Sequence, residues 1–246
     1  MNHVTRRSFV TTVGAAVIPA SALFSTPSGA AAPSTATKAA EPIKSAYLFF
    51  NAAEIRFIEP ACERLIPADE LGPGARSAGV PIYLDRQLGG AWGAGERLYR
   101  SGPWLPATPT QGYQLPFTPA ELFHVSLRAI DRDLDAHGNP FAGMSIDAQD
   151  DYLKSLEAGA HDLDGVPSAV FFDTLLKMSI EGFFSDPVYG GNKDMLAWRM
   201  IGFPGAYADY FEAIDRQGLK FERQPMSLGE NARGQVHVNP DVPAHL

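Results

Sequence analysis

Two early stretches of the chain repeat apolar residues at helical spacing. The first stripe has one apolar residue every three or four positions: Ile55, Ile58, Ala61 and Leu65. It follows Asn51-Ala52-Ala53-Glu54, a capping-box sequence, and Pro67 should end it. The second stripe ends at Gly89-Gly90 and consists of Val80, Leu84 and Leu88. The pattern therefore predicts two helices in this part of the chain.

Five more helices are predicted after residue 118, four of them described here and the fifth in the corner described below. Thr118-Pro119-Ala120-Glu121 combines an N-cap, a proline at the first helical position and a capping-box Glu. The apolar face that follows consists of Leu122, Val125, Ala129 and Leu134. Asp147–Glu157 has the pattern of a shorter amphipathic helix, and Ser168 is expected to cap a phenylalanine-rich helix that reaches Phe184. A last helix is predicted over Tyr207–Arg216.

Residues 90–117 have no regular period. Aromatic residues alternate there with Gly and Pro: Trp92, Tyr99, Trp104, Tyr113 and Phe117. We expect a long loop that its aromatic side chains pin to the body. No alternating run typical of a strand occurs anywhere, so the predicted fold class is all-α, with six or seven helices and long Gly-, Pro- and aromatic-rich loops.

A sharp corner is predicted between Gly182 and Gly205. Pro187 should end the incoming helix, and Gly190 and Gly191 permit the positive φ of a tight turn. Asn192 should then cap a helix over Lys193–Ile201, and Gly202 suits its C-terminal cap. This stretch, named the corner below, is either a rigid helix–turn–helix element or a docking surface.

The N-terminus resembles an export signal. Arg6, Arg7 and Phe9 stand ahead of a short apolar run, as in the twin-arginine signal, and Ala30-Ala31-Ala32 suits signal peptidase. The predicted organisation is a signal peptide at 1–32, a linker at 33–42, a helical domain at 43–220 and a loose tail at 221–246. The twin-arginine route carries proteins that have already folded.

Charge and cysteine content narrow the function. A formal net charge of −8 over 246 residues argues against nucleic-acid binding, which needs a basic face. The single cysteine, Cys62, excludes an internal disulfide and a CxxC metal site. It lies in a helical pattern, where a buried and inert thiol is expected.

No stretch carries a recognisable active site. Asp131–Gly138 begins like a calcium loop, but its glycine comes two positions late and Ala142 stands where the bidentate Glu belongs. The six histidines form no metal-ligand spacing, and His124 is expected to be a hydrogen-bonded structural residue. We therefore expect no catalytic, cofactor-binding or metal-binding residues in this chain.

Several motifs resemble the subunit 3 family of gluconate 2-dehydrogenase. They lie between Phe49 and Gln217 and include Leu65–Asp69, Pro73–Ala75 and Gly79-Val80. The most specific group is Asp186–Asn192 and Ile201–Gly205 together with Trp198. The resemblance implies a small periplasmic subunit without a redox centre. Its implied partners are an FAD-dependent large subunit of the glucose–methanol–choline oxidoreductase type, a multihaem cytochrome c that passes electrons to membrane quinone, and the twin-arginine translocase.

In this reading the chain helps its flavoprotein partner to mature and to be exported. The candidate interface residues are the aromatic and turn residues of the corner: Tyr189, Gly190, Gly191, Asn192, Trp198 and Phe203. Trp92 and Trp104 are further candidates by composition. The alternative is a stand-alone periplasmic carbohydrate-binding protein or enzyme whose aromatic loop, Trp92 to Phe117, stacks on sugar rings.

Overall fold

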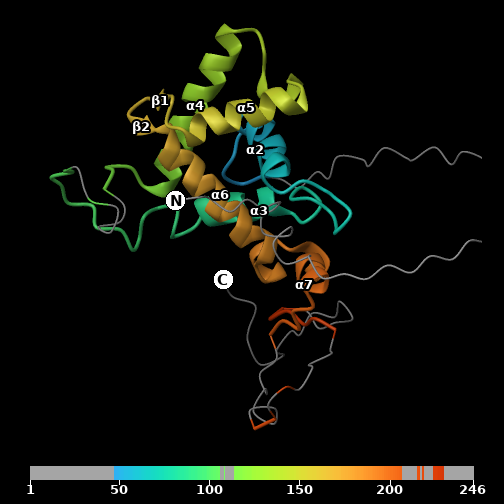
Figure 1. Cartoon of the computed structure of the whole chain (residues 1–246). Coiled ribbons are helices and arrows are strands. Elements are labelled where there is room, and N and C mark those ends of the chain that lie inside the picture. The colour runs from blue at the N-terminus through green and yellow to red at the C-terminus, as the bar shows by residue number, and fades with distance from the viewer. Residues whose placement is uncertain are drawn as a thin grey trace, which may run out of the picture. The chain divides into compact units, whose positions relative to one another are not determined.

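The computed structural model describes residues 47–105, 108, 114–206, 215–216, 218 and 224–229. The main helices are α2 (Ala52–Leu65), α3 (Val80–Leu88), α4 (Pro119–Ala136), α5 (Ile146–Glu157), α6 (Ser168–Phe184) and α7 (Leu196–Ile201) (Figure 1). Three single turns of 3-10 helix accompany them: η2 (Phe141–Gly143), η3 (Pro187–Tyr189) and η4 (Lys193–Met195). The prediction of an all-α fold is confirmed. None of the described helices is long and apolar enough to cross a membrane.

The predicted helix starts agree with the structure at α2 and α4. Asn51 and Thr118 each accept a hydrogen bond from a backbone N–H of the first turn, and Glu54 and Glu121 return a carboxylate to the cap. Both capping boxes are therefore complete. The C-terminus of α3 lies at Gly89, as predicted.

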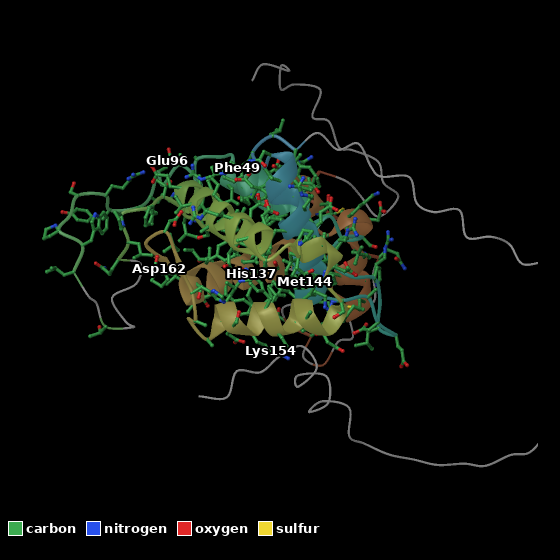
Figure 2. All side chains as sticks on the ribbon, turned by 90° about the horizontal axis from the view of Figure 1, so that it is seen from above. Phe49, Glu96, His137, Met144, Lys154 and Asp162 are labelled. Atoms are coloured by element: carbon green, nitrogen blue, oxygen red, sulfur yellow. The ribbon has the colours of Figure 1, made fainter. Side chains whose placement is uncertain are left out.

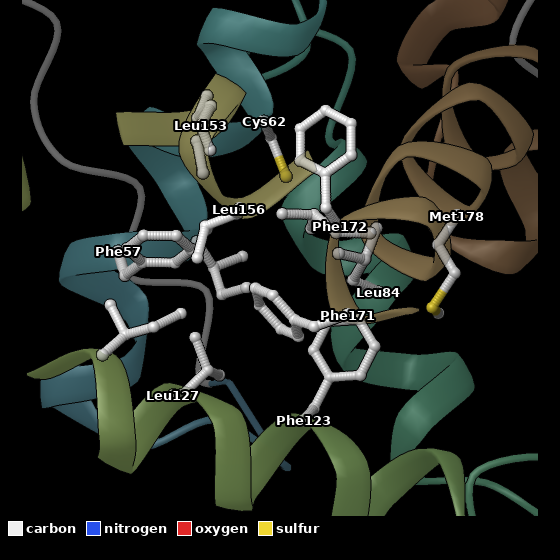
Figure 3. Close-up of a cluster of buried hydrophobic side chains, with 14 of the residues drawn as sticks. Phe57, Cys62, Leu84, Phe123, Leu127, Leu153, Leu156, Phe171, Phe172 and Met178 are labelled. Carbon is white, nitrogen blue, oxygen red and sulfur yellow. The ribbon is translucent and has the colours of Figure 1, made fainter. Parts of the chain in front are cut away.

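Helix α6 occupies the centre of the fold. It packs against α2, α3, α4, α5 and α7. Its side chains are apolar around most of its circumference, which is typical of a helix surrounded by others. Phe171 of α6 is fully buried and meets the ring of Phe123 from α4 edge-to-face at 5.3 Å (Figure 3). This core fixes the direction in which α6 delivers the chain to the corner.

The structure differs from the sequence prediction at one short hairpin. β1 (Asp162–Leu163) pairs antiparallel with β2 (Val166–Pro167), with Leu163 opposite Val166. The connecting Asp164 and Gly165 both have positive φ, 55° and 90°. Strands of two residues are too short to show alternation, so the apolar pattern could not predict them.

Ser168 does not cap α6 in the way predicted. It is the first helical residue, and Pro167 is the N-cap without a side-chain hydrogen bond. The Ser168 hydroxyl instead donates to the carbonyl of Leu156 at 3.0 Å and accepts from the backbone N–H of His161 at 3.3 Å. The residue therefore ties the end of α5 to the start of α6.

The long loop is less firmly pinned than expected. Trp92 and Tyr99 are 43% and 80% exposed, whereas Phe117 packs against the core. Tyr113 and most of the predicted helix Tyr207–Arg216 lie outside the described residues. Within the predicted tail, residues 224–229 are described: Met226 forms a parallel bridge with Gly205, and the N–H of Leu228 donates to Asp186 at 2.7 Å.

Candidate partner-docking surface

Polar residues that could carry chemistry are scattered across the fold. In the part of the chain that the structure describes, no three His, Cys, Asp or Glu side chains come together as a metal site. A hollow there, lined by residues of α2, α4 and η2, has room for about one water molecule. Substrate pockets are far larger. This hollow is therefore too small to hold a sugar.

Ser155 and His161, both among the described residues, form a pair that resembles a nucleophile and its base. The Ser155 hydroxyl lies 2.9 Å from Nε2 of His161. The same hydroxyl donates to the carbonyl of Tyr152 at 2.6 Å, so its proton points to its own helix and not to the histidine. The pair is therefore a helix-end hydrogen bond that links α5 to the β1 side of the hairpin.

Cys62 is buried, as predicted. It is fully inaccessible on α2, and the Ser179 hydroxyl of α6 lies 3.7 Å from its sulfur. Burial raises the pKa of the thiol to about 12, so the reactive thiolate is not populated near neutral pH. The residue packs as a small apolar side chain between two helices.

The corner begins where α6 ends at Phe184. The Asp186 carboxylate accepts the N–H of Val188 at 3.0 Å and so caps η3. Pro187 occupies the first position of that turn, which agrees with its predicted effect on α6. Gly190 then ends η3 with φ of 101°, a conformation that glycine adopts without steric cost.

Gly191 is required for a different reason from the one predicted. It does not have a positive φ. A Cβ atom placed on it would collide with the carbonyl oxygen of Gly182 on α6. Gly182 itself lies under the ring of Tyr83, whose nearest atom would be 2.8 Å from an added Cβ. The two glycines therefore let η3 and α3 approach α6 closely.

Asn192 is a buried brace across the corner. It is 0% exposed, its Nδ2 donates to the carbonyl of Ser185 at 2.9 Å, and its Oδ1 accepts the N–H of Ala197 at 2.9 Å. The predicted helix over Lys193–Ile201 is wrong in its first turn. Asp194 and Met195 have φ of 56° and 55°, and α7 starts only at Leu196. Asn192 thus caps α7 from four residues upstream of it.

Trp198 completes the brace from the other side. It is 6% exposed, and its indole N–H donates to the carbonyl of Phe184 at 2.8 Å. The ring of Phe203 meets it edge-to-face at 5.2 Å. Gly202 between them has φ of 70° and ends α7, as predicted. The chain after α7 is therefore held back against the end of α6.

An exposed apolar surface lies on this framework. Of the thirteen large apolar side chains that are exposed among the described residues, seven belong to the end of α6, to the corner or to the segment that pairs with it. These seven, named the corner surface, are Ile180, Phe184, Val188, Tyr189, Ile201, Phe203 and Leu228. Such clustering is typical of a protein-interaction site.

The elements of the corner surface also carry exposed charged side chains of both signs: Glu181, Lys193, Asp194 and Arg199. Protein interfaces commonly combine apolar and charged side chains.

The predicted interface residues separate into two groups. Tyr189 and Phe203 are 51% and 43% exposed and belong to the corner surface. Gly191, Asn192 and Trp198 are buried and support it from below, and Gly190 is half-buried at its edge. Trp92 and Trp104 lie on the separate loop after α3.

Sequence reasoning missed the other five members of the corner surface, which are Ile180, Phe184, Val188, Ile201 and Leu228. Ile180 and Phe184 are four residues apart on α6 and so share one face of it. An apolar residue on an unburied face looks the same in sequence as one on the buried face. The sequence did contain one indication of such exposed residues: α6 is apolar around most of its circumference, more than packing on one face requires.

Comparison with known proteins agrees with the motifs of the corner. Residues 52–205 match the family model described as Gluconate 2-dehydrogenase subunit 3. No curated protein sequence and no solved structure matches the chain. The family match covers more than half of the 246 residues and includes α2 through α7. The chain therefore belongs to the gluconate 2-dehydrogenase subunit 3 family.

Proposed function

We propose that this chain is the non-catalytic small subunit of a membrane-associated, FAD-dependent gluconate or sugar dehydrogenase complex. Its family is named for a third subunit of an enzyme, which gives the chain an accessory role beside partner subunits. The observation that carries the proposal is the corner surface, where a rigid frame holds seven apolar side chains in solvent. A surface of this kind is suited to bind another protein chain.

The chemistry of the complex belongs to its partners in this proposal. The large flavoprotein subunit holds FAD and oxidises the sugar, and a multihaem cytochrome c accepts the electrons. The small subunit binds the flavoprotein during maturation, and the corner surface covers part of it. The buried Asn192 and Trp198 keep that surface in one conformation before the partner arrives.

Export is the second part of the proposal. Arg6, Arg7 and Phe9, which lie outside the described residues, form the twin-arginine signal of the complex. The signal brings the small subunit and the folded flavoprotein together to the translocase. The mature subunit is then periplasmic and reaches the membrane through the complex.

Affinity purification of the full chain from its host tests the class of function. We expect a yellow flavoprotein and a red cytochrome to co-elute with it, and their absorbance spectra identify the two cofactors. The control is a chain in which Tyr189 and Phe203 are both replaced by Ser, which should recover less of both partners. Purification of the chain alone under mild conditions would contradict the proposal.

Exposed aromatic side chains favour one second candidate, a carbohydrate-binding protein. The loop that runs on from Glu96 projects from the helices in both whole-molecule views (Figures 1 and 2) and carries Tyr99 at 80% exposure. Trp92 at its base is 43% exposed. Titration calorimetry of the isolated chain with gluconate and glucose separates the candidates. Saturable binding favours the carbohydrate function, and the accessory-subunit proposal predicts none.

A further inference from the structure

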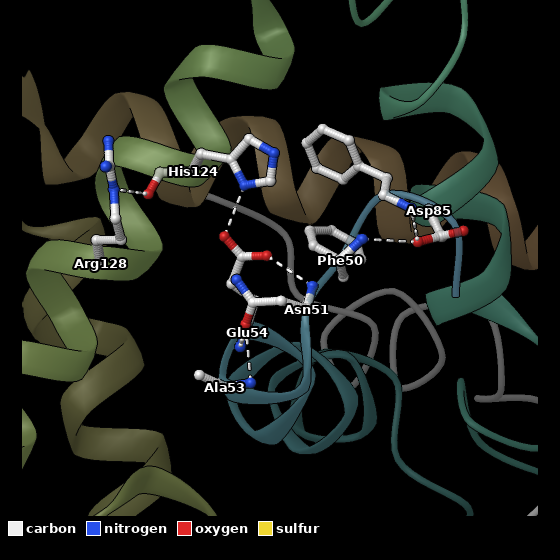
Figure 4. Close-up of polar contacts among 8 residues, drawn as sticks. Phe50, Asn51, Ala53, Glu54, Asp85, His124 and Arg128 are labelled. Carbon is white, nitrogen blue, oxygen red and sulfur yellow. Dashed lines mark hydrogen bonds and ion pairs between the residues drawn. The ribbon is translucent and has the colours of Figure 1, made fainter. Parts of the chain in front are cut away.

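The segment Tyr47–Asn51, which directly precedes α2, is named the strap. Side chains of the helices hold it in place. Three successive backbone N–H groups donate to the Asp85 carboxylate of α3. The donors are Leu48 at 2.8 Å and Phe49 and Phe50 at 2.9 Å each. Figure 4 shows the carboxylate facing the strap at Phe50. At its other end the Tyr47 hydroxyl donates to Glu59 at 2.8 Å.

Glu54 and His124 hold the next part of the strap. One oxygen of the Glu54 carboxylate accepts the N–H of Asn51 at 2.9 Å. The other oxygen lies 2.6 Å from Nδ1 of His124 on α4, as drawn in Figure 4. The His124 ring in turn stacks on Phe49 with centroids 4.1 Å apart. The predicted structural role of His124 is confirmed by these contacts.

The strap and the helices depend on each other. Asp85 and Glu54 are only 2% and 5% exposed, and a buried carboxylate is costly unless hydrogen-bond donors surround it. The strap supplies those donors through its backbone. Conversely, four successive strap amides find their acceptors on side chains of α2 and α3 instead of in a helix or sheet. The strap is therefore ordered only when α2, α3 and α4 have assembled around it.

We propose that the strap is a latch that couples completion of this helical assembly to the export signal. The inference rests on the proposed function, because it concerns the export of the chain. The strap is the part of the folded body through which the signal at 1–32 is attached. A closed latch holds Tyr47–Asn51 against α2, α3 and α4. An open latch releases the Phe49 and Phe50 rings, so that the translocase meets an apolar, unfolded stretch at the start of the helical domain.

Asp85→Asn in the full-length chain should open the latch, because it removes the charge while leaving the size of the side chain nearly unchanged. The Asn side chain cannot accept all three backbone N–H groups, because an NH2 group, which donates hydrogen bonds, replaces one of the two carboxylate oxygens. Native-state hydrogen exchange should show the amides of Leu48, Phe49 and Phe50 exchanging at least about tenfold faster, while those in the middle of α6 keep their rates. Unchanged exchange at the strap would overturn the latch.

Export supplies the second measurement, with Asp150→Asn as the matched control. Asp150 pairs with Arg64 at 2.7 and 2.9 Å on the α5 side of the fold, and none of these contacts involves the strap. We expect Asp85→Asn to lower the exported fraction of the chain several-fold and Asp150→Asn to leave it near wild type. Equal losses in both variants would overturn the latch in favour of general instability.

A faster strap exchange with normal export of Asp85→Asn would also overturn the coupling. That result would leave the accessory-subunit proposal intact, because the purification experiment does not depend on the strap. Failure of the purification experiment would not alter the exchange rates. The two proposals can therefore fail separately.

Discussion

Tyr189 and Asn192 lie three residues apart in the corner and differ completely in burial. Tyr189 is 51% exposed and stands on a 3-10 turn, whereas Asn192 is 0% exposed and makes two hydrogen bonds that bridge α6 and α7. The sequence placed both residues in one candidate interface, Tyr189 as an aromatic residue and Asn192 as a turn residue. The structure leaves the first exposed to solvent and buries the second, which supports the surface from below.

Alanine substitutions should separate these two roles. Tyr189→Ala is expected to weaken the complex about tenfold or more and to change the melting temperature of the isolated subunit little, since half of the side chain is already in water. Asn192→Ala should cost about 2 to 4 kcal/mol of unfolding free energy, because it strands a buried carbonyl and a buried N–H.

Thermal unfolding and a binding titration with the flavoprotein measure both variants. A large loss of stability in Tyr189→Ala, with binding unchanged, would return that residue to a purely structural role.

At the scale of elements, the corner depends on close backbone approach. η3 and α6 meet at Gly191 and Gly182, and α3 meets α6 where Tyr83 covers Gly182. The chain between η3 and α7 adds Asn192, Asp194 and Met195 in the left-handed region. Three non-glycine residues in that region within four positions are unusual and imply that the surrounding packing holds them.

Gly191→Ala should force η3 away from α6. The added methyl group meets backbone and not a flexible side chain, so we expect a loss of about 2 to 3 kcal/mol in the free energy of unfolding. Gly202→Ala is the control: its φ of 70° disfavours alanine, but no atom lies within 4 Å of the added methyl. Its cost should be about 1 kcal/mol.

Urea denaturation of the two glycine variants measures the difference. Equal costs would mean that η3 can shift without loss, and the corner would then be less rigid than the structure indicates.

The sequence was sufficient to predict the helices and their ends where local chemistry decides them. The capping boxes at Asn51 and Thr118 and the terminal glycines at Gly89 and Gly202 are local signals, and all four agree with the structure. The first turn after Asn192 could not be predicted, because tertiary packing overrides helix propensity there. The β1–β2 hairpin did have a local signal: Asp164-Gly165 is a two-residue turn sequence.

The position of the corner was predictable from the sequence, but which of its side chains are exposed was not. The unusual Gly190-Gly191-Asn192 motif marked the corner, although Gly191 is needed for close approach to α6 and not for the turn itself. Which aromatic side chains face water depends on how α6 is rotated in the bundle, and that rotation is fixed by contacts between distant residues such as Phe123 and Phe171. Such contacts leave no trace in a single sequence.

At the scale of the whole molecule, we propose separate functions for the N-terminal export signal and the helical domain. In this proposal the folded part binds the partner and the N-terminus directs export. A formal net charge of −8 keeps such a chain away from nucleic acid and favours solubility until its partner is bound.

Replacing Arg6 and Arg7 together by Lys should test this division. The twin-arginine route depends on the arginine pair, so we expect both this chain and its flavoprotein to remain in the cytoplasm. Fractionation of cells, followed by dehydrogenase activity and immunoblotting of each fraction, measures the outcome. The matched control is Arg56→Lys, an exposed change on α2 that should leave export intact. Normal dehydrogenase activity in the periplasm of cells with the double variant would rule out a role of this chain in exporting the flavoprotein.

The indole of Trp198 gives the corner an optical signature. It is one of three tryptophans, and it is 6% exposed with its N–H bonded to the carbonyl of Phe184. Trp92, by contrast, is 43% exposed. With Trp92 and Trp104 replaced by Phe, the remaining fluorescence would come from directly beneath the corner surface. A change in Trp198 emission would then report the binding of a partner to the corner surface in real time, whether or not the partner has been identified.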